Sequence, residues 1–157
     1  MPINPKLQTQ DCNCFAVRQA ARHVTQFYDQ YLAPIGLRTS QFSILAKLSR
    51  LGPMTINALA AELVMDRTTL GRNILPLDRD GLITIKPGAT DRRVKELHLT
   101  AAGAEKVQTG VKHWGVAQTR FEAAFGPKRS SELRDLLCKL VATDLGSTQP
   151  MAQERAG

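Results

Sequence analysis

The sequence predicts a mainly helical α+β fold in which a helix-turn-helix and a small β-hairpin are inserted between longer helices. Three observations predict this fold. Apolar residues recur at steps of three and four over most of the chain, a β-rich run interrupts them at residues 82–85, and capping residues precede the helical stretches. The length of 157 residues fits one compact domain, and the lack of a long apolar run argues against a membrane span.

The first helix is expected to run from Phe15 to about Ala33, where Pro34 and Gly36 end it. Its apolar stripe consists of Phe15, Ala20, Val24, Phe27, Tyr28 and Tyr31. The first ten and the last ten residues show no such periodicity, and we expect both segments to be frayed tails.

Three shorter helices are expected next. Thr39 or Ser40 is placed to cap the first of them, Thr55 the second, and Asp66 the third, which Gly81 terminates. A turn of a few residues joins the second and third of these helices, so the pair is a candidate helix-turn-helix.

A two-stranded hairpin is predicted after these helices. Residues 82–85 and 94–99 are rich in β-forming side chains, and Pro87 and Gly88 signal a turn between them. The charged residues at its tip are Asp91, Arg92 and Arg93.

Two long helices are expected to close the chain. Thr100 is placed to cap the first, and Gly126 and Pro127 separate it from the second. The first has a heptad seam, a pattern typical of helix pairing, formed by Val107, Val111, Trp114, Gln118, Phe121 and Phe125. The apolar faces of these two helices and of the first helix exceed what a winged helix of roughly 65 residues can cover, which predicts a homodimer.

A helix-turn-helix followed by a basic hairpin is a winged helix, which suits double-stranded DNA. A helix fits the major groove, and a thin β-ribbon reaches the minor groove. The net charge of +7 favours a polyanionic partner, although residues 51–95 hold seven basic and five acidic residues and so contribute only +2. Affinity should therefore depend on where individual cations lie.

The predicted DNA-contacting residues lie on the last short helix and on the hairpin. Arginine pairs with guanine, asparagine with adenine, and a threonine methyl contacts thymine. Asp91 is expected to orient a neighbouring guanidinium by a salt bridge. The full set is Arg67, Thr68, Thr69, Arg72, Asn73, Asp91, Arg92, Arg93 and Lys95. The alternative is an ordinary solvated helix face and a charged, soluble turn.

Two stretches resemble the MarR (multiple-antibiotic-resistance regulator) family of bacterial winged-helix regulators. They are MDRTTLGRNILPLDRDGLI (residues 65–83) and TDRRVKELHLTAAG (residues 90–103). Asp91 and Arg93 match the D-x-R signature of the wing, and Leu99, Thr100 and Gly103 match the motif that follows it. The resemblance implies an obligate homodimer, in which each protomer presents one recognition helix and one wing to half of a roughly palindromic operator.

We therefore expect three segments in the chain. Residues 1–35 would form a tail and a dimerisation helix, residues 36–100 the winged helix-turn-helix, and residues 101–157 two further dimerisation helices and a tail.

The family resemblance also implies a small aromatic or acidic effector, bound between the dimer helices and the DNA-binding part. Candidate residues for such a cleft are Arg18, Arg22, His23, Tyr28 and Trp114. The alternative is that each lies on a helix surface or at the dimer interface.

The C-x-C pair of Cys12 and Cys14 supports a different sensing hypothesis. The run CFAVRQAARHVTQFYD (residues 14–29) is similar to the first helix of the organic-hydroperoxide-sensing branch of the family, although Arg18 and Thr39 stand where that branch has tyrosines. A helix N-terminus and Arg18 would favour a reactive thiolate at Cys14, with Cys12 as a resolving partner. One alternative to redox sensing is that the cysteines have no functional role. Another is that Cys12 and Cys14 bind a thiolate-preferring metal ion together with His23. No second ligand pair supports that site, so we expect no metal and no cofactor.

Together these patterns predict a cytoplasmic, homodimeric repressor that releases DNA in response to a ligand or an oxidant. No export signal opens the sequence, and no membrane partner is expected. A thiol-based redox sensor using Cys14 is the first alternative. A small thiol-dependent enzyme is the second, and it lacks a glycine-rich phosphate loop and a credible pair of nucleophile and base. An interaction scaffold that only retains the winged helix is the third.

Overall fold

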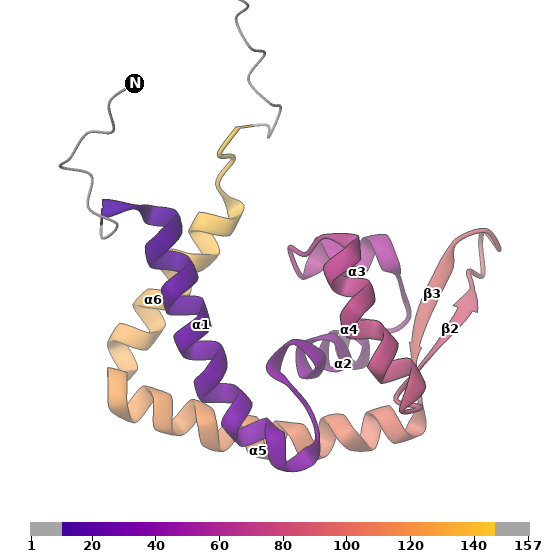
Figure 1. Ribbon diagram of the computed structural model, residues 1–157, viewed down its shortest axis with the longest axis horizontal. Coiled ribbons are helices and arrows are strands. Elements are labelled where there is room, and N and C mark those ends of the chain that lie inside the picture. Colours follow the sequence, from indigo (N-terminus) through magenta and orange to yellow (C-terminus); the bar gives the residue numbers. More distant parts are fainter. Residues whose placement is uncertain (1–10, 147–157) are drawn as a thin grey trace, which may run out of the picture. The chain divides into compact units, whose positions relative to one another are not determined.

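The computed structural model describes residues 11–146, so the predicted frayed tails lie outside the described part of the chain. The chain divides into two compact units, one up to Gln118 and one from Thr119 onward. The elements of the first unit are α1 (Asn13–Leu32), the short 3₁₀ helix η2 (Ala33–Ile35), α2 (Thr39–Leu51), β1 (Met54–Thr55), α3 (Ile56–Glu62), α4 (Arg67–Arg79), β2 (Ile83–Pro87) and β3 (Lys95–Leu99). Helix α5 (Ala101–Phe125) begins in the first unit and ends in the second, which also contains α6 (Pro127–Ala142) (Figure 1).

The predicted fold class is confirmed, with one addition to the sheet. The hairpin of β2 and β3 is present, and the two-residue strand β1 pairs with the free edge of β3 to give the antiparallel order β1-β3-β2. Met54 lies opposite Leu97, and Thr55 lies opposite Glu96. The sequence pattern predicted two strands only, because a two-residue strand is too short to show alternation.

A single apolar core holds α2, α3, α4 and the sheet together. The helical spacing of Leu70, Ile74 and Leu77 brings all three to the buried face of α4. They belong to a cluster that also contains Leu32, Leu37, Phe42, Ile44, Leu45, Leu48, Leu59, Ala60, Leu82, Ile83, Leu97 and Val107. Because one side of α4 is buried in this cluster, its opposite side must face solvent.

The start of α2 differs from the prediction that Thr39 or Ser40 caps it. The capping position is Arg38, whose backbone N–H donates to Gln41 Oε1 at 3.0 Å. Thr39 is already helical, and its N–H and its hydroxyl both donate to Asp29 Oδ1 at 2.6 Å. The threonine therefore ties α2 to α1, a role that its local sequence does not reveal.

Two glycines let α5 approach the winged-helix core closely. A Cβ on Gly103 would lie 2.1 Å from the carbonyl oxygen of Leu82, and one on Gly110 would lie 2.5 Å from Cε2 of Phe42. Thr100 caps the helix as predicted, since its hydroxyl accepts from the N–H of Gly103 at 3.0 Å.

No helix within residues 11–146 combines the length and the apolar character needed to cross a membrane.

The turn between α3 and α4 is closed by backbone hydrogen bonds and contains a valine in an unfavourable conformation. The N–H of Val64 donates to the carbonyl of Ala61, and that of Met65 donates to Ala60, which is the Schellman arrangement for ending a helix. Glycine is favoured at the position of Val64, because the backbone there is left-handed, with φ of 51°. The valine side chain is 72% exposed, so little packing offsets the strain.

The substitution Val64→Gly should stabilise the protein by about 0.5–1 kcal/mol. A β-branched residue in the left-handed region costs roughly 1–2 kcal/mol, and the extra freedom of glycine in the unfolded chain offsets part of the gain. Urea unfolding measures the change. The matched control is Val116→Gly in the half-exposed middle of α5, which should destabilise the protein. Equal losses in both variants would show that the turn is not strained.

Candidate nucleic-acid interface

The N-terminal half of α4 presents a polar face to solvent. Asp66 caps the helix as predicted, accepting from the N–H of Thr69 at 2.8 Å and from its hydroxyl at 2.6 Å. These hydrogen bonds from Thr69 lower the pKa of the Asp66 carboxyl below its ordinary value of 3.8. Arg67, Thr68 and Arg72 are exposed, and no side-chain hydrogen bond or ion pair within residues 11–146 engages them. These three side chains are available to a partner.

Asn73, also predicted to contact DNA, is half-buried and engaged within the fold. Its Oδ1 accepts from the hydroxyl of Ser40 at 2.8 Å, and its Nδ2 donates to the carbonyl of Thr69 at 2.9 Å. The side chain therefore joins α4 to α2 and retains one Nδ2 hydrogen for a further contact. It helps to set the position of α4 on the core.

The tip of the wing is organised by a carboxylate that hydrogen-bonds to the backbone. Asp91 Oδ1 accepts from the N–H of Arg93 at 2.9 Å, and the N–H of Gly88 donates to the carbonyl of Val94 at 2.7 Å. The expected salt bridge from Asp91 to a guanidinium is absent from the described residues, because this carboxylate is used to shape the turn. Arg92 and Arg93 are exposed and have no ion-pair partner within residues 11–146.

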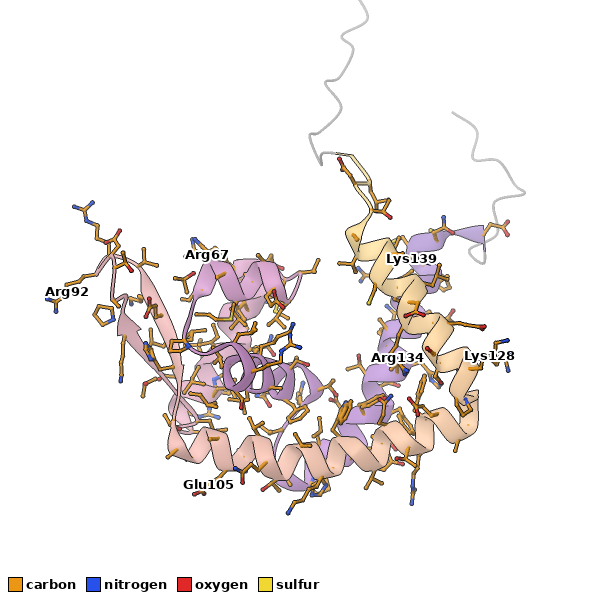
Figure 2. All side chains as sticks on the ribbon, turned by 180° about the vertical axis from the view of Figure 1, so that it is seen from behind. Arg67, Arg92, Glu105, Lys128, Arg134 and Lys139 are labelled. Atoms are coloured by element: carbon orange, nitrogen blue, oxygen red, sulfur yellow. The ribbon has the colours of Figure 1, made fainter. Side chains whose placement is uncertain are left out.

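A hollow lies where α3, α4 and the wing meet. Its volume is about 300 Å³, and its lining residues are Ile56, Asn57, Arg67, Arg93, Val94 and Lys95. Three predicted DNA-contacting cations, Arg67 from α4 and Arg93 and Lys95 from the wing, therefore lie on one concave surface. In Figure 2, Arg67 lies at the start of α4 and Arg92 lies at the tip of the wing beside it.

The residues proposed for an effector cleft are only partly brought together. The hydroxyl of Tyr28 donates to Gln118 Oε1 at 2.6 Å, and this contact ties α1 to α5. Trp114 lies one turn before Gln118 on the same helix and is 40% exposed. The other three candidates, Arg18, Arg22 and His23, are exposed on α1.

The cysteines are exposed free thiols at the start of α1 and on α6. Cys12 caps α1, and its Sγ accepts from the N–H of Phe15 at 3.4 Å. Cys14 lies in the first turn of the same helix, and Cys138 lies on α6. Within residues 11–146, no group of three or more His, Cys, Asp or Glu side chains is arranged to hold a metal ion.

Four residues that were not predicted to be functional contribute to this surface. Ser40 positions Asn73, and Ile56, Asn57 and Val94 line the hollow. The cap at Thr55 was the sequence signal that could have pointed to Asn57, because it places that residue in the first turn of α3, next to α4. The contact between Ser40 and Asn73 spans 33 positions and has no local signal.

Comparisons with known proteins agree with the fold. A family model described as the MarR family matches residues 37–95. The transcriptional regulator MosR of M. tuberculosis, in a crystal structure with DNA, is 38% identical, with a TM-score of 0.72 over 86% of this chain and 100% of that one. The HTH-type transcriptional regulator YwoH of Bacillus subtilis (strain 168) is 32% identical over 92 residues, which are 59% of this chain and 66% of that protein. CouR from Rhodococcus jostii RHA1, bound to p-coumaroyl-CoA, shares the fold at 19% identity, with a TM-score of 0.72 over 90% of this chain and 100% of that one.

The cap at Asp66 should make the stability of the protein depend on pH. A carboxyl whose pKa is lowered on folding stabilises the folded state above its unfolded pKa, and this contribution is lost as the pH falls through the folded value. Asp66→Asn keeps an oxygen acceptor but removes the charge, so its thermal midpoint should lie below that of wild type at pH 7. The difference should shrink as the pH falls below 3.8.

Circular dichroism between pH 7 and pH 3 measures this difference. The control is Asp78→Asn on the same helix, whose side chain makes no hydrogen bond or ion pair within residues 11–146. A deficit in Asp66→Asn that stays constant over the whole pH range would contradict the account.

Proposed function

The chain belongs to the MarR family of DNA-binding transcriptional regulators, and on that premise we propose that it is a homodimeric repressor. In this proposal each protomer inserts α4 into the major groove and places its wing on the adjacent minor groove of a pseudo-palindromic operator. A small aromatic or acidic effector, or an oxidant, changes the spacing of the two recognition helices and so releases the DNA.

The observation that carries the DNA-binding surface is the set of unengaged cations on α4 and the wing. Thr68 and Arg72 are four residues apart and lie opposite the buried face of α4, where they can reach base edges. Arg92 and Arg93 extend the same surface onto the wing. The crystal structure of MosR with DNA supports the assignment, because MosR is 38% identical to this chain over most of its length.

Exposed apolar side chains on the flanking helices support the homodimer. On α6, Leu136 and Val141 are each 65% exposed, and on α5 Val111 is 49% exposed. Such surface is costly to leave in water, and a second copy of the chain would cover it. In this proposal residues 1–35 and 101–157 supply the dimer helices, and residues 36–100 supply the winged helix-turn-helix.

The effector proposal rests on two aromatic residues near the contact between Tyr28 of α1 and Gln118 of α5. Trp114 lies one turn before Gln118, and Arg18 and Arg22 supply positive charge on the same helix as Tyr28. The complex of CouR with p-coumaroyl-CoA supports an aromatic acid or its thioester as the class of effector.

The DNA-binding proposal predicts that Arg72→Ala weakens binding to a duplex selected by the wild-type protein from a random-sequence pool. Loss of a bidentate base contact costs about 1–3 kcal/mol, so the dissociation constant should rise by roughly 5- to 150-fold. Fluorescence anisotropy over a salt series measures it. Arg79→Ala is the control, because Arg79 lies in the last turn of α4 and pairs with Asp80 at 3.2 Å. Equal affinities of wild type and Arg72→Ala at every salt concentration would refute the assignment.

Thiol control is a second candidate, favoured by the position of the C-x-C pair at the N-terminus of α1. Exposed thiols next to helix N–H groups are suited to oxidation. If Cys14 is the sensor, hydrogen peroxide should release wild-type protein from DNA and leave Cys14→Ser bound, while the control Cys138→Ser should behave as wild type. Release of all three proteins, or of none, would exclude this candidate and leave the small-ligand proposal.

A further inference from the structure

Resting on the proposed function, we propose that the hollow between α3, α4 and the wing holds one phosphate group of the DNA backbone. Arg67, Arg93 and Lys95 would bind that phosphate jointly. This assigns Arg67 to the backbone, whereas the sequence analysis placed it among the residues that meet base edges.

The lining of the hollow has the chemistry of an anion site. It contains two guanidinium groups, one ammonium group and the amide of Asn57, but no carboxylate. The nearby acids are engaged elsewhere. Asp66 accepts from Thr69, and Asp91 accepts from the backbone of Arg93. None of the three cations forms an ion pair with an acidic side chain within residues 11–146.

The volume of the hollow suits a segment of DNA backbone. A volume of about 300 Å³ is large enough for a phosphodiester group. The hollow is lined from both the proposed recognition helix α4 and the wing. The strand between a major groove and the neighbouring minor groove would pass there when both elements are docked.

The geometry of α4 separates Arg67 from the residues that face the bases. At about 100° per residue, Thr68 and Arg72 point directly away from the buried side defined by Leu70, Ile74 and Leu77. Arg67 projects to the flank of the helix, and that flank is the one that lines the hollow. Thr68 and Arg72 are thus left for the bases, while Arg67 shares an anion with the wing.

Single methylphosphonate substitutions in the pool-selected duplex test the proposal, because each one removes the charge of one known phosphate. The dissociation constant is measured for wild type, Arg67→Gln, Lys95→Gln and the double variant. Lys86→Gln is the matched control, since Lys86 is an exposed cation of the same wing that does not line the hollow. Thermal midpoints confirm that the variants fold.

One phosphate in each half-site should weaken wild-type binding about tenfold when it is neutralised. Neutralising the same phosphate should raise the dissociation constant by a smaller factor in each single variant and by less than about twofold in the double variant. In Lys86→Gln it should raise the dissociation constant as much as in wild type. The proposal is overturned if methylphosphonate substitution weakens DNA binding by the double variant as much as by wild type. It is also overturned if Arg67→Gln and Lys95→Gln become insensitive to the substitution of different phosphates. DNA binding itself would survive either result. Failure of wild type to select any duplex would instead refute the proposed function.

Discussion

The short connection between α3 and α4 is the constraint on which the proposed DNA-binding surface depends. Two backbone hydrogen bonds, from Val64 and Met65, close the end of α3, and the carboxylate of Asp66 then starts α4. The chain thus satisfies both helix ends within a few residues, and the angle between the helices has little freedom. Because Leu70 and Ile74 bury the inner side of α4, this turn determines where its outer side can reach. The strain at Val64 is the cost of so short a connection.

The positions of the charged side chains on α4 and the wing, rather than the total charge, make this surface suited to an anion. Residues 51–95 carry only two more basic than acidic residues, yet several of the acids are already engaged. Glu62 pairs with Lys47, which lowers the pKa of the glutamate, and Asp66 and Asp91 accept hydrogen bonds from nearby backbone N–H groups. Arg67, Arg72, Arg92 and Arg93 form no ion pair within residues 11–146, so their charges can be offered to an external anion although the net charge of the segment is small.

Local patterns in the sequence were sufficient for most of the fold but not for contacts between distant residues. Periodicity and capping residues predicted the helices and the hairpin, because those signals lie within a few positions of one another. Strand β1 was missed, since only its pairing with Leu97 defines it. The roles of Thr39 and Asn73 depend on Asp29 and Ser40, which no local pattern links to them. The sequence therefore named most of the candidate DNA-contacting residues without showing which of them share the hollow.

In the proposed complex, two copies of the chain present their recognition helices and wings to one face of a DNA duplex. Hydroxyl-radical footprinting of the pool-selected duplex detects this arrangement, since it reports backbone protection at each nucleotide. We expect two equivalent protected patches centred about one helical turn, or 10 base pairs, apart and related by the symmetry of the site. A single protected patch, or uniform protection without two-fold symmetry, would contradict it.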